Sequence, residues 1–373
     1  MSNQLQQFGN VYLPETESSG FCKGVVSAIE VMDGTVSAAQ VLNYRSPVYG
    51  YHEIVHNRDV FSRFEDLGVI FVDDENQIPD DSLVIPSAHG TGRQVKHSLT
   101  LRGCLVIDAV CPLVTHTHIA ADDARGAGEF LLYAVEKLPK TDGSMHDEMR
   151  GFLGTADHYI DKEGNLVFDP MPKKLVQLED PFDGIVDFVR DQGFKKVRLV
   201  TQTTLNDLAS ITFGKELGKV FGSVSGFDRL KTAQHGNHVC RAVRDRTDAA
   251  TDGAVILRPR KAVVVTDPGS NNGKTYVRAL ESLGMARLGF MDVLSVSGPD
   301  DPRLPKLRSE ESVFVTASAS TPDETLAAVV GKISGEIMPI PKRPSFKLYH
   351  EGRRLTPDNI TMIIAEWMSS KAA

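Results

Sequence analysis

The sequence predicts an α/β fold in which short parallel strands are buried on both faces. Apolar runs of strand length alternate with helical patterns along the 373 residues. Continuous apolar runs, in contrast to alternating ones, are typical of strands that helices cover on both sides. Small polar residues directly follow five of these runs, at the strand ends where open α/β sheets bind ligands. The runs assigned to strands are Ser82–Pro86, Cys104–Ile107, Phe130–Val135, Val197–Val200, Ala262–Val265 and Ser312–Val315.

The length of the chain predicts more than one lobe. A chain of 373 residues exceeds what one small hydrophobic core supports. Three cysteines each open a segment of roughly similar size, which indicates a coarse threefold organisation. We therefore expect an N-terminal extension, three α/β lobes and a C-terminal tail, with boundaries at 1–19, 20–110, 111–239, 240–338 and 339–373.

Composition and charge exclude several classes of protein. The net charge is −8, and acidic and basic residues are mixed along the chain, whereas nucleic-acid surfaces need clustered Lys and Arg. The first ten residues are polar and lack the pattern of a secretory signal. The apolar runs are far shorter than the about 20 residues that span a bilayer. We expect a cytoplasmic protein that binds neither nucleic acid nor membrane.

Polar side chains at the strand ends are candidates for ligand binding. His89 follows the first strand, Thr203 lies three residues after Val197–Val200, and Ser270 and Ser320 follow the last two strands. The segment Thr321–Glu324 predicts an N-cap, a proline at the first helical position and a capping-box glutamate, with a helix from Asp323 to about Ile333. A helix start just behind Ser320 favours an anion.

The cysteines indicate a metal centre. Cys22, Cys111 and Cys240 lie in loops that precede helical patterns, one in each expected lobe. A thiolate near a helix start has a lowered pKa and is a good metal ligand. Three thiolates on a [4Fe–4S] cluster would leave one iron open for substrate. The alternative is three unrelated buried thiols. Cys104 begins an apolar strand and is assigned to packing.

Three histidines and one glutamate are the best-placed candidates for acid–base chemistry. His56, His89 and His146 could hold a phosphate when protonated or orient a substrate when neutral. Taken singly, a histidine of this kind is more often a solvated or hydrogen-bonded structural residue. Glu148 precedes a glycine-containing segment and could act as a general acid, although most glutamates are simply solvated. A structural role is assigned to the histidines at 52, 116, 118, 235 and 238.

Taken together, nine segments resemble the 4-hydroxy-3-methylbut-2-enyl diphosphate reductase family, which catalyses the last step of the non-mevalonate isoprenoid pathway. They follow one another in the family's order from about Gly20 to about Val330. Their sequences are GFCKGVVSAIE (20–30), EIVHN (53–57), SAHGTG (87–92), IDAVCPLV (107–114), HDEMRG (146–151), TQTTL (201–205), HVCRA (238–242), SNN (270–272) and TASASTPD (316–323).

The resemblance implies three α/β lobes in a pseudo-threefold arrangement around a central [4Fe–4S] cluster. It implies reductive dehydroxylation of the allylic diphosphate to isopentenyl and dimethylallyl diphosphate, with a ferredoxin or flavodoxin as electron donor. In this reaction the open iron would bind the substrate hydroxyl, which two electrons and protons would expel as water. The residues that match the family's motifs are Cys22, Cys111 and Cys240 as cluster ligands; His56, His89, Ser270, Asn272 and Ser320 around the diphosphate; His146 against the substrate; and Glu148 with Thr203 for proton delivery.

The sequence departs from the family's pattern near the substrate and near the third cysteine. The loop Ser270–Gly273 lacks two hydroxyls that the family shows there, and the family's Thr-Thr-Asn-Arg-Gln run is replaced by Val243–Thr247. Within that run, Arg244 and Arg246 either add positive charge near the pocket or are solvated on a helix. Three alternatives therefore stay open: a paralogue whose cluster acts on another anionic substrate by reduction or dehydration, a non-catalytic iron–sulfur sensor, and a zinc hydrolase.

Overall fold

The computed structural model describes residues 5–15, 18–55, 57–142, 144–205, 207–222, 224–225, 240–285, 291–305 and 311–372. The chain forms two compact units, and each unit combines stretches that are distant in sequence. The first unit consists of Met1–Ser27, Val55–Asp66 and Arg241–Phe346, and the second of Ala28–Ile54, Leu67–Cys240 and Lys347–Ala373. Helix α1 (Lys23–Val41) begins in the first unit and continues in the second.

The first unit is built on a five-stranded sheet with the order β1-β2-β15-β13-β14. All its neighbouring strands pair in parallel except β1 and β2. Two of the strands come from residues 6–13, which the sequence analysis placed in a separate N-terminal extension. The bounds are β1 (Gln6–Phe8), β2 (Val11–Leu13), β13 (Lys261–Val265), β14 (Asp292–Val296), β15 (Val313–Ala317), α2 (Arg58–Asp66), α8 (Arg241–Leu257), α9 (Asn271–Leu283) and α10 (Asp323–Ser334).

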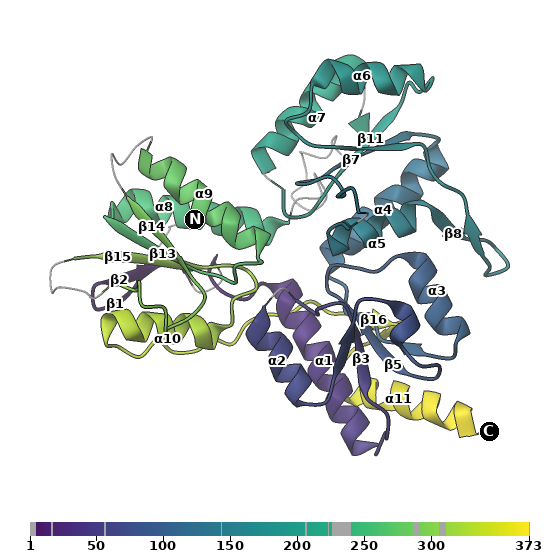
Figure 1. Ribbon diagram of the computed structural model, residues 1–373, viewed down its shortest axis with the longest axis horizontal. Coiled ribbons are helices and arrows are strands. Elements are labelled where there is room, and N and C mark those ends of the chain that lie inside the picture. The colour runs from purple at the N-terminus through teal and green to yellow at the C-terminus, as the bar shows by residue number, and fades with distance from the viewer. Residues whose placement is uncertain are drawn as a thin grey trace. The chain divides into compact units, whose positions relative to one another are not determined.

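Helices cover both faces of this sheet, which explains why its strands are apolar throughout. Helices α8 and α9 lie on one face and α10 on the other (Figure 1). Successive side chains of a strand point to opposite faces. On β13, Val263 and Val265 pack with Leu326 and Val329 of α10, whereas Val264 packs with residues of α8 and α9.

The second unit contains two parallel four-stranded sheets, with orders β4-β3-β5-β6 and β10-β7-β11-β12. In the latter sheet α4 and α5 cover one face and α6 and α7 the other (Figure 1). The bounds are β3 (Val48–Tyr51), β4 (Ile70–Val72), β5 (Leu83–Pro86), β6 (Leu105–Val106), β7 (Phe130–Ala134), β8 (His158–Ile160), β9 (Leu166–Phe168), β10 (Lys173–Val176), β11 (Val197–Thr201), β12 (Val224–Ser225), α3 (Arg93–Leu101), α4 (Pro112–Ala127), α5 (Asp147–Ala156), α6 (Phe182–Asp191) and α7 (Asp207–Phe221).

The predicted α/β class is confirmed, and all six predicted strands are present as β5, β6, β7, β11, β13 and β15. Each of them pairs in parallel with a neighbouring strand. Cys104 is buried against strands β3 and β5 and helix α3, and this packing role is the one that the sequence predicts. None of the helices in the described part of the chain is long and apolar enough to cross a bilayer.

The predicted capping box at the start of α10 is wrong. The N-cap of α10 is Pro322, and no side chain caps the helix there. Thr321 instead donates its hydroxyl to the carbonyl oxygen of Val265 (2.8 Å) and shares a hydrogen bond with Ser318 (2.8 Å). The Thr321 hydroxyl therefore bonds to a carbonyl oxygen at the end of a strand, whereas the sequence pattern predicted that it caps the helix.

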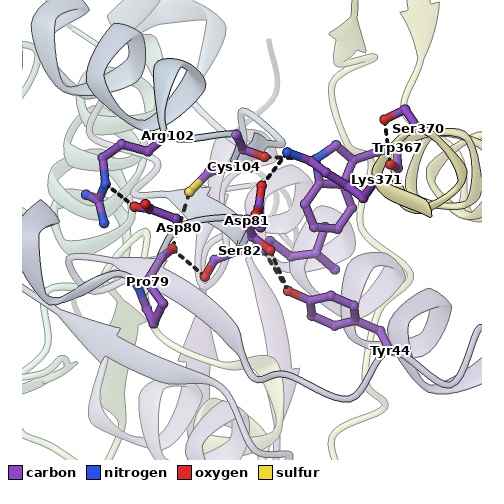
Figure 2. A network of polar contacts seen from close by, with 12 residues as sticks. Tyr44, Pro79, Asp80, Asp81, Ser82, Arg102, Cys104, Trp367, Ser370 and Lys371 are labelled. Carbon is purple, nitrogen blue, oxygen red and sulfur yellow. Dashed lines mark hydrogen bonds and ion pairs between the residues drawn. The ribbon is translucent and has the colours of Figure 1, made fainter. Parts of the chain in front are cut away.

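Helix α11 (Pro357–Ala372), in the C-terminal tail, packs in the second unit. Figure 2 shows Trp367 and Lys371 of this helix beside Asp81 and Tyr44. The indole N–H of Trp367 donates to the carbonyl oxygen of Gly103 (3.0 Å), and its ring lies 5.9 Å from that of Tyr44. Lys371 forms an ion pair with Asp81. Burial raises the pKa of Tyr44, whose hydroxyl accepts from the backbone N–H of Leu83 (3.2 Å).

Candidate active site

Cys111 lies at the junction between β6 and α4. Asp108 accepts a hydrogen bond from the N–H of Val110 (3.0 Å), which forms a turn, and Pro112 then starts the helix with Cys111 as its N-cap. The N–H of Cys111 donates to the carbonyl oxygen of Ala88 (3.1 Å), so the cysteine is tied to the loop that carries His89. The thiol is partly exposed and is not in a disulfide.

The predicted pair His89 and His146 lies together in the second unit. Their ring centroids are 5.9 Å apart in an edge-on arrangement. His146 is the N-cap of α5, and its Nδ1 accepts from the N–H of Glu148 (3.3 Å). Nδ1 therefore carries no proton in this bond, which leaves the proton of the neutral ring on Nε2. Nε2 is therefore the donor atom of the neutral His146 ring.

Glu148 and Thr203 form a buried, hydrogen-bonded pair. Glu148 is 0% exposed, and its Oε1 accepts from the backbone N–H of Thr203 (2.7 Å) while its Oε2 lies 3.0 Å from the Thr203 hydroxyl. A backbone N–H can only donate, so Oε1 is always an acceptor. A hydroxyl can donate to a carboxylate or accept from a carboxylic acid. The proton of neutral Glu148 is therefore placed on Oε2.

Cys240 is joined to the same pair through the backbone. Its N–H donates to the carbonyl oxygen of Thr203 (2.7 Å), and α8 starts at the next residue. One residue, Thr203, thus fixes both the carboxyl group of Glu148 and the main chain of Cys240. The second unit brings together six predicted site residues, namely His89, Cys111, His146, Glu148, Thr203 and Cys240.

Tyr133 is a neighbour of Glu148 that the sequence analysis missed. It is 0% exposed on β7, and its ring lies 4.1 Å from that of Phe152, one helical turn after Glu148 on α5. Burial, and secondarily the charge of Glu148, raise the pKa of Tyr133 well above its ordinary value, so the phenol stays neutral. Within an apolar strand run, this tyrosine could not be distinguished from a core aromatic residue.

The first unit assembles the other predicted residues. The N–H of Cys22 donates to the carbonyl oxygen of Ala319 (3.0 Å), and the N–H of Ala319 donates to Oδ1 of Asn272 (2.8 Å). Ser270 caps α9 by accepting from the N–H of Gly273 (3.2 Å), and Ser320 lies in the same loop as Ala319, before α10. The buried Nδ2 of Asn272 has no hydrogen-bond partner among the described residues. Such a donor suits a bound anion.

The remaining predictions for the site stay predictions. His56 lies outside the described residues. Cys22 belongs to the first unit, and Cys111 and Cys240 to the second. No group of three or more His, Cys, Asp or Glu side chains that could hold a metal ion is found in the described ranges. The donor chemistry nevertheless fits an iron–sulfur cluster, because each of these cysteines lies outside any disulfide and directly before a helix.

Two histidines that were assigned structural roles have such roles in the second unit. Nδ1 of His52 lies 2.9 Å from a carboxylate oxygen of Asp73. Nδ1 of His118 lies 3.1 Å from the hydroxyl of Thr155 on α5. Burial is the main cause that lowers the pKa of His118 to about 4, so the ring is neutral at pH 7. His118 therefore packs and orients α5 without adding charge to it.

Gly151 allows α5 to approach the backbone of the His89 loop. A Cβ at this position would lie 2.8 Å from the carbonyl oxygen of Gly90. Gly151→Ala is expected to destabilise the protein by about 1–3 kcal/mol, because a backbone atom has to move. Gly126→Ala on α4 is the matched control, since a Cβ there meets nothing within 4 Å, and should stabilise by about 0.5–1 kcal/mol. The midpoint of urea unfolding, measured for both variants, gives these changes in stability. Equal midpoints for the two variants would contradict the close approach of Gly151 to the backbone of Gly90.

Known proteins resemble this chain over most of its length. The sequence profile of a family described as "LytB protein" matches residues 14–334. A "4-hydroxy-3-methylbut-2-enyl diphosphate reductase" of Photobacterium profundum is 28% identical over 91% of this chain and 97% of its own length. One of Acinetobacter baumannii is 30% identical over 84% of this chain and 87% of its own. The solved structure of the "E-1-hydroxy-2-methyl-but-2-enyl-4-diphosphate reductase" from Plasmodium falciparum is similar in fold, with a TM-score of 0.66, 24% identity, and coverage of 95% and 98%.

Proposed function

The chain belongs to the LytB protein family, and from this premise we propose that it is an iron–sulfur oxidoreductase that reductively dehydroxylates 4-hydroxy-3-methylbut-2-enyl diphosphate. The products are isopentenyl and dimethylallyl diphosphate. The observation that carries the proposal is the buried pair of Glu148 and Thr203, which is hydrogen-bonded to the backbone of Cys240. A protected proton donor beside a candidate cluster ligand serves a reduction, whereas a non-catalytic sensor has no use for it.

The reaction consumes two electrons and two protons. The bond between carbon and the hydroxyl oxygen breaks, the hydroxyl leaves as water, and a new C–H bond forms. When bound by Cys22, Cys111 and Cys240, a [4Fe–4S] cluster would supply electrons and an open iron position that polarises the hydroxyl. The protein has to supply the proton, hold the diphosphate and exclude bulk water.

Glu148 supplies the proton to the leaving hydroxyl. Its neutral form carries the proton on Oε2, the atom that faces the Thr203 hydroxyl. Once that proton has left, the carboxylate accepts from both the N–H and the hydroxyl of Thr203. The two donors lower the energy of the charged form, which would otherwise be unfavourable at 0% exposure. Thr203 thereby serves both protonation states of Glu148.

Each unit contains donors that we assign to the substrate oxygens from the resemblance to the family. In the first unit these are Nδ2 of Asn272, the hydroxyls of Ser270 and Ser320, and the N-termini of α9 and α10. In the second unit they are His89 and Nε2 of His146, with His56 assigned to the same role by sequence alone. All of these groups can donate to an anion, and they carry no fixed negative charge. We further propose a ferredoxin or flavodoxin as electron donor and a cytoplasmic location.

A second candidate function rests on the loop that departs from the family's pattern. Ser270 and Asn272 are in place, but the loop Ser270–Gly273 offers fewer hydroxyls than the family's pattern has. Fewer donors favour a smaller or less charged anion. The second candidate is therefore a reductase or dehydratase of another anionic molecule that uses the same cluster.

Anaerobic turnover of the reconstituted protein tests the proposal. The measurement combines the visible spectrum with product analysis, using 4-hydroxy-3-methylbut-2-enyl diphosphate and a chemical reductant. A brown protein that forms both isoprenoid diphosphates is the expected result. A brown protein that leaves this substrate untouched favours the second candidate. A protein that stays colourless after reconstitution rejects the cluster, and a zinc enzyme would be colourless in this way.

A further inference from the structure

Two buried arginines hold the loop that leads into Cys22. Arg343, from the C-terminal tail, donates its Nη2 to the carbonyl oxygen of Ser19. Arg246, on α8, donates its Nη2 to the carbonyl oxygen of Phe21 (3.1 Å). Both side chains belong to the first unit, as does the loop. The main chain on the N-terminal side of Cys22 is thus fixed by two guanidinium groups.

The positive charge of Arg343 is compensated by the carboxylate of Asp323. Its Nε and Nη2 atoms lie 2.6 Å from the two carboxylate oxygens of Asp323, and both side chains are 6% exposed. Gly20, with a φ of +72°, packs against this pair, since a Cβ there would lie 2.5 Å from Asp323 and 2.7 Å from Arg343. The bidentate geometry compensates the buried charge. Arg343 therefore needs no further anion.

Among the described residues, Arg246 has no such compensation. It is 6% exposed, and the partners of its side chain in this part of the chain are two carbonyl oxygens, those of Phe21 and of Ala242 (3.4 Å from Nη1). Its buried Nε has no hydrogen-bond partner, and no carboxylate forms an ion pair with it, within the described residues. An arginine stays protonated in proteins, and a buried charge without a counter-ion is strongly unfavourable. The uncompensated charge of Arg246 points to an anion that the folded protein binds.

We propose that Arg246 is the buried counter-charge of the cysteine-bound iron–sulfur centre. This inference rests on the proposed function, because it takes the centre as bound through Cys22. The guanidinium group contacts the residue directly before Cys22, and its helix starts directly after Cys240. An iron–sulfur cluster with three thiolate ligands is an anion, and its negative charge grows on reduction. A fixed positive charge beside it stabilises the reduced form and raises the reduction potential.

Three variants separate charge from shape. Arg246→Met removes the charge but keeps the length of the side chain, and Arg246→Lys keeps the charge. Arg244→Met is the matched control, because Arg244 lies on the same helix, 39% exposed, and pairs with Asp245. For each variant we would measure the stability of the apoprotein, the iron content after reconstitution and the reduction potential from a redox titration followed in the visible spectrum.

The expected results differ for apoprotein and loaded protein. The Arg246→Met apoprotein should be at least as stable as the wild type, because an uncompensated charge has been removed. Its loaded form should have a more negative reduction potential and retain less iron. Arg246→Lys should stay close to the wild type in potential, and Arg244→Met should match the wild type throughout. If Arg246→Met does not fold, a wild-type potential with Arg246→Lys still supports the proposal and a markedly lower one overturns it.

Two results would overturn the inference while the proposed function stands. One is a loaded Arg246→Met protein with the potential and iron content of the wild type. The other is an unchanged potential with weaker binding of the substrate, which would assign the charge to the diphosphate. A wild-type protein that binds no cluster would reject the proposed function and the inference together. The wild-type measurement therefore distinguishes the two failures.

Discussion

Glu148→Gln is expected to lower turnover of 4-hydroxy-3-methylbut-2-enyl diphosphate by about 10²–10⁴-fold, the range that general acid catalysis supplies. Glutamine has the shape of glutamate, and its oxygen can still accept from the backbone N–H of Thr203. Its amide group cannot release a proton at neutral pH. The loss should therefore fall on kcat, with KM largely unchanged, because Glu148 is buried and held by Thr203 rather than placed among the diphosphate donors.

Thr203→Val is the companion to this variant. It keeps the backbone N–H that donates to Oε1 and removes only the hydroxyl beside Oε2. A smaller loss of kcat is expected, since the carboxyl group keeps one of its two donors. The visible spectrum of both variants serves as the check that the cluster has formed. Wild-type turnover by Glu148→Gln would show that the proton comes from another group.

Replacing any one of the three candidate ligands should have the largest effect of all. Cys22→Ser, Cys111→Ser and Cys240→Ser are each expected to abolish turnover and to remove most of the visible absorption, because a cluster with two thiolate ligands is poorly held. The fourth cysteine is the matched control. Cys104→Ala removes a thiol of 6% exposure that packs against the strands of its own sheet. It should cost about 1 kcal/mol of stability and leave the spectrum and turnover intact.

The pattern across these four variants decides the ligand set. Three colourless variants and one coloured variant are the expected outcome. A Cys22→Ser protein that keeps both its colour and its iron would mean that the first unit does not supply a ligand. A colourless Cys104→Ala protein with a normal unfolding midpoint would add Cys104 to the metal centre.

The strands could be predicted from sequence where both of their faces are buried. The run Ala262–Val265 is apolar at every position because α10 covers one face of β13 and α8 and α9 the other. Strand β3 was not predicted, because Gly50 interrupts a short run in which no two adjacent residues are aliphatic. Strand β14 was also not predicted, since an aspartate and a serine leave no continuous apolar run longer than two residues, and only the last residue of the strand is buried.

The candidate site was accessible from sequence only as separate pieces. The resemblance to the family placed Glu148 and Thr203 in the same role, and the structure joins them by two hydrogen bonds across 55 residues of sequence. The sequence alone left two places open for Arg246, near the pocket or solvated on a helix. Its burial depends on the loop before Cys22, which is 225 residues away along the chain. Contacts of this kind depend on tertiary folding, which a local pattern does not encode.

The pairing between the N-terminal strand β2 and the distant strand β15 also could not be predicted. Residues 1–19 read as an extension, yet Val11 pairs with Val313 in one sheet. Each strand of this pair has an ordinary local sequence, and only the pairing shows that residues 6–13 belong to the same sheet as β13, β14 and β15. The capping box at Thr321 failed for a related reason, because a carbonyl oxygen from a distant strand, that of Val265, was a better acceptor.

The C-terminal helix gives the protein a built-in optical reporter. Trp367 is the only tryptophan in the sequence, so all indole fluorescence comes from one position on α11. Its N–H is bonded to Gly103 and its ring lies beside Tyr44, so release of the helix would expose the indole to water and change its emission. Far-ultraviolet circular dichroism follows the whole chain, whereas this emission follows one contact. Recording both during unfolding would show whether the tail detaches before the sheets of the second unit open.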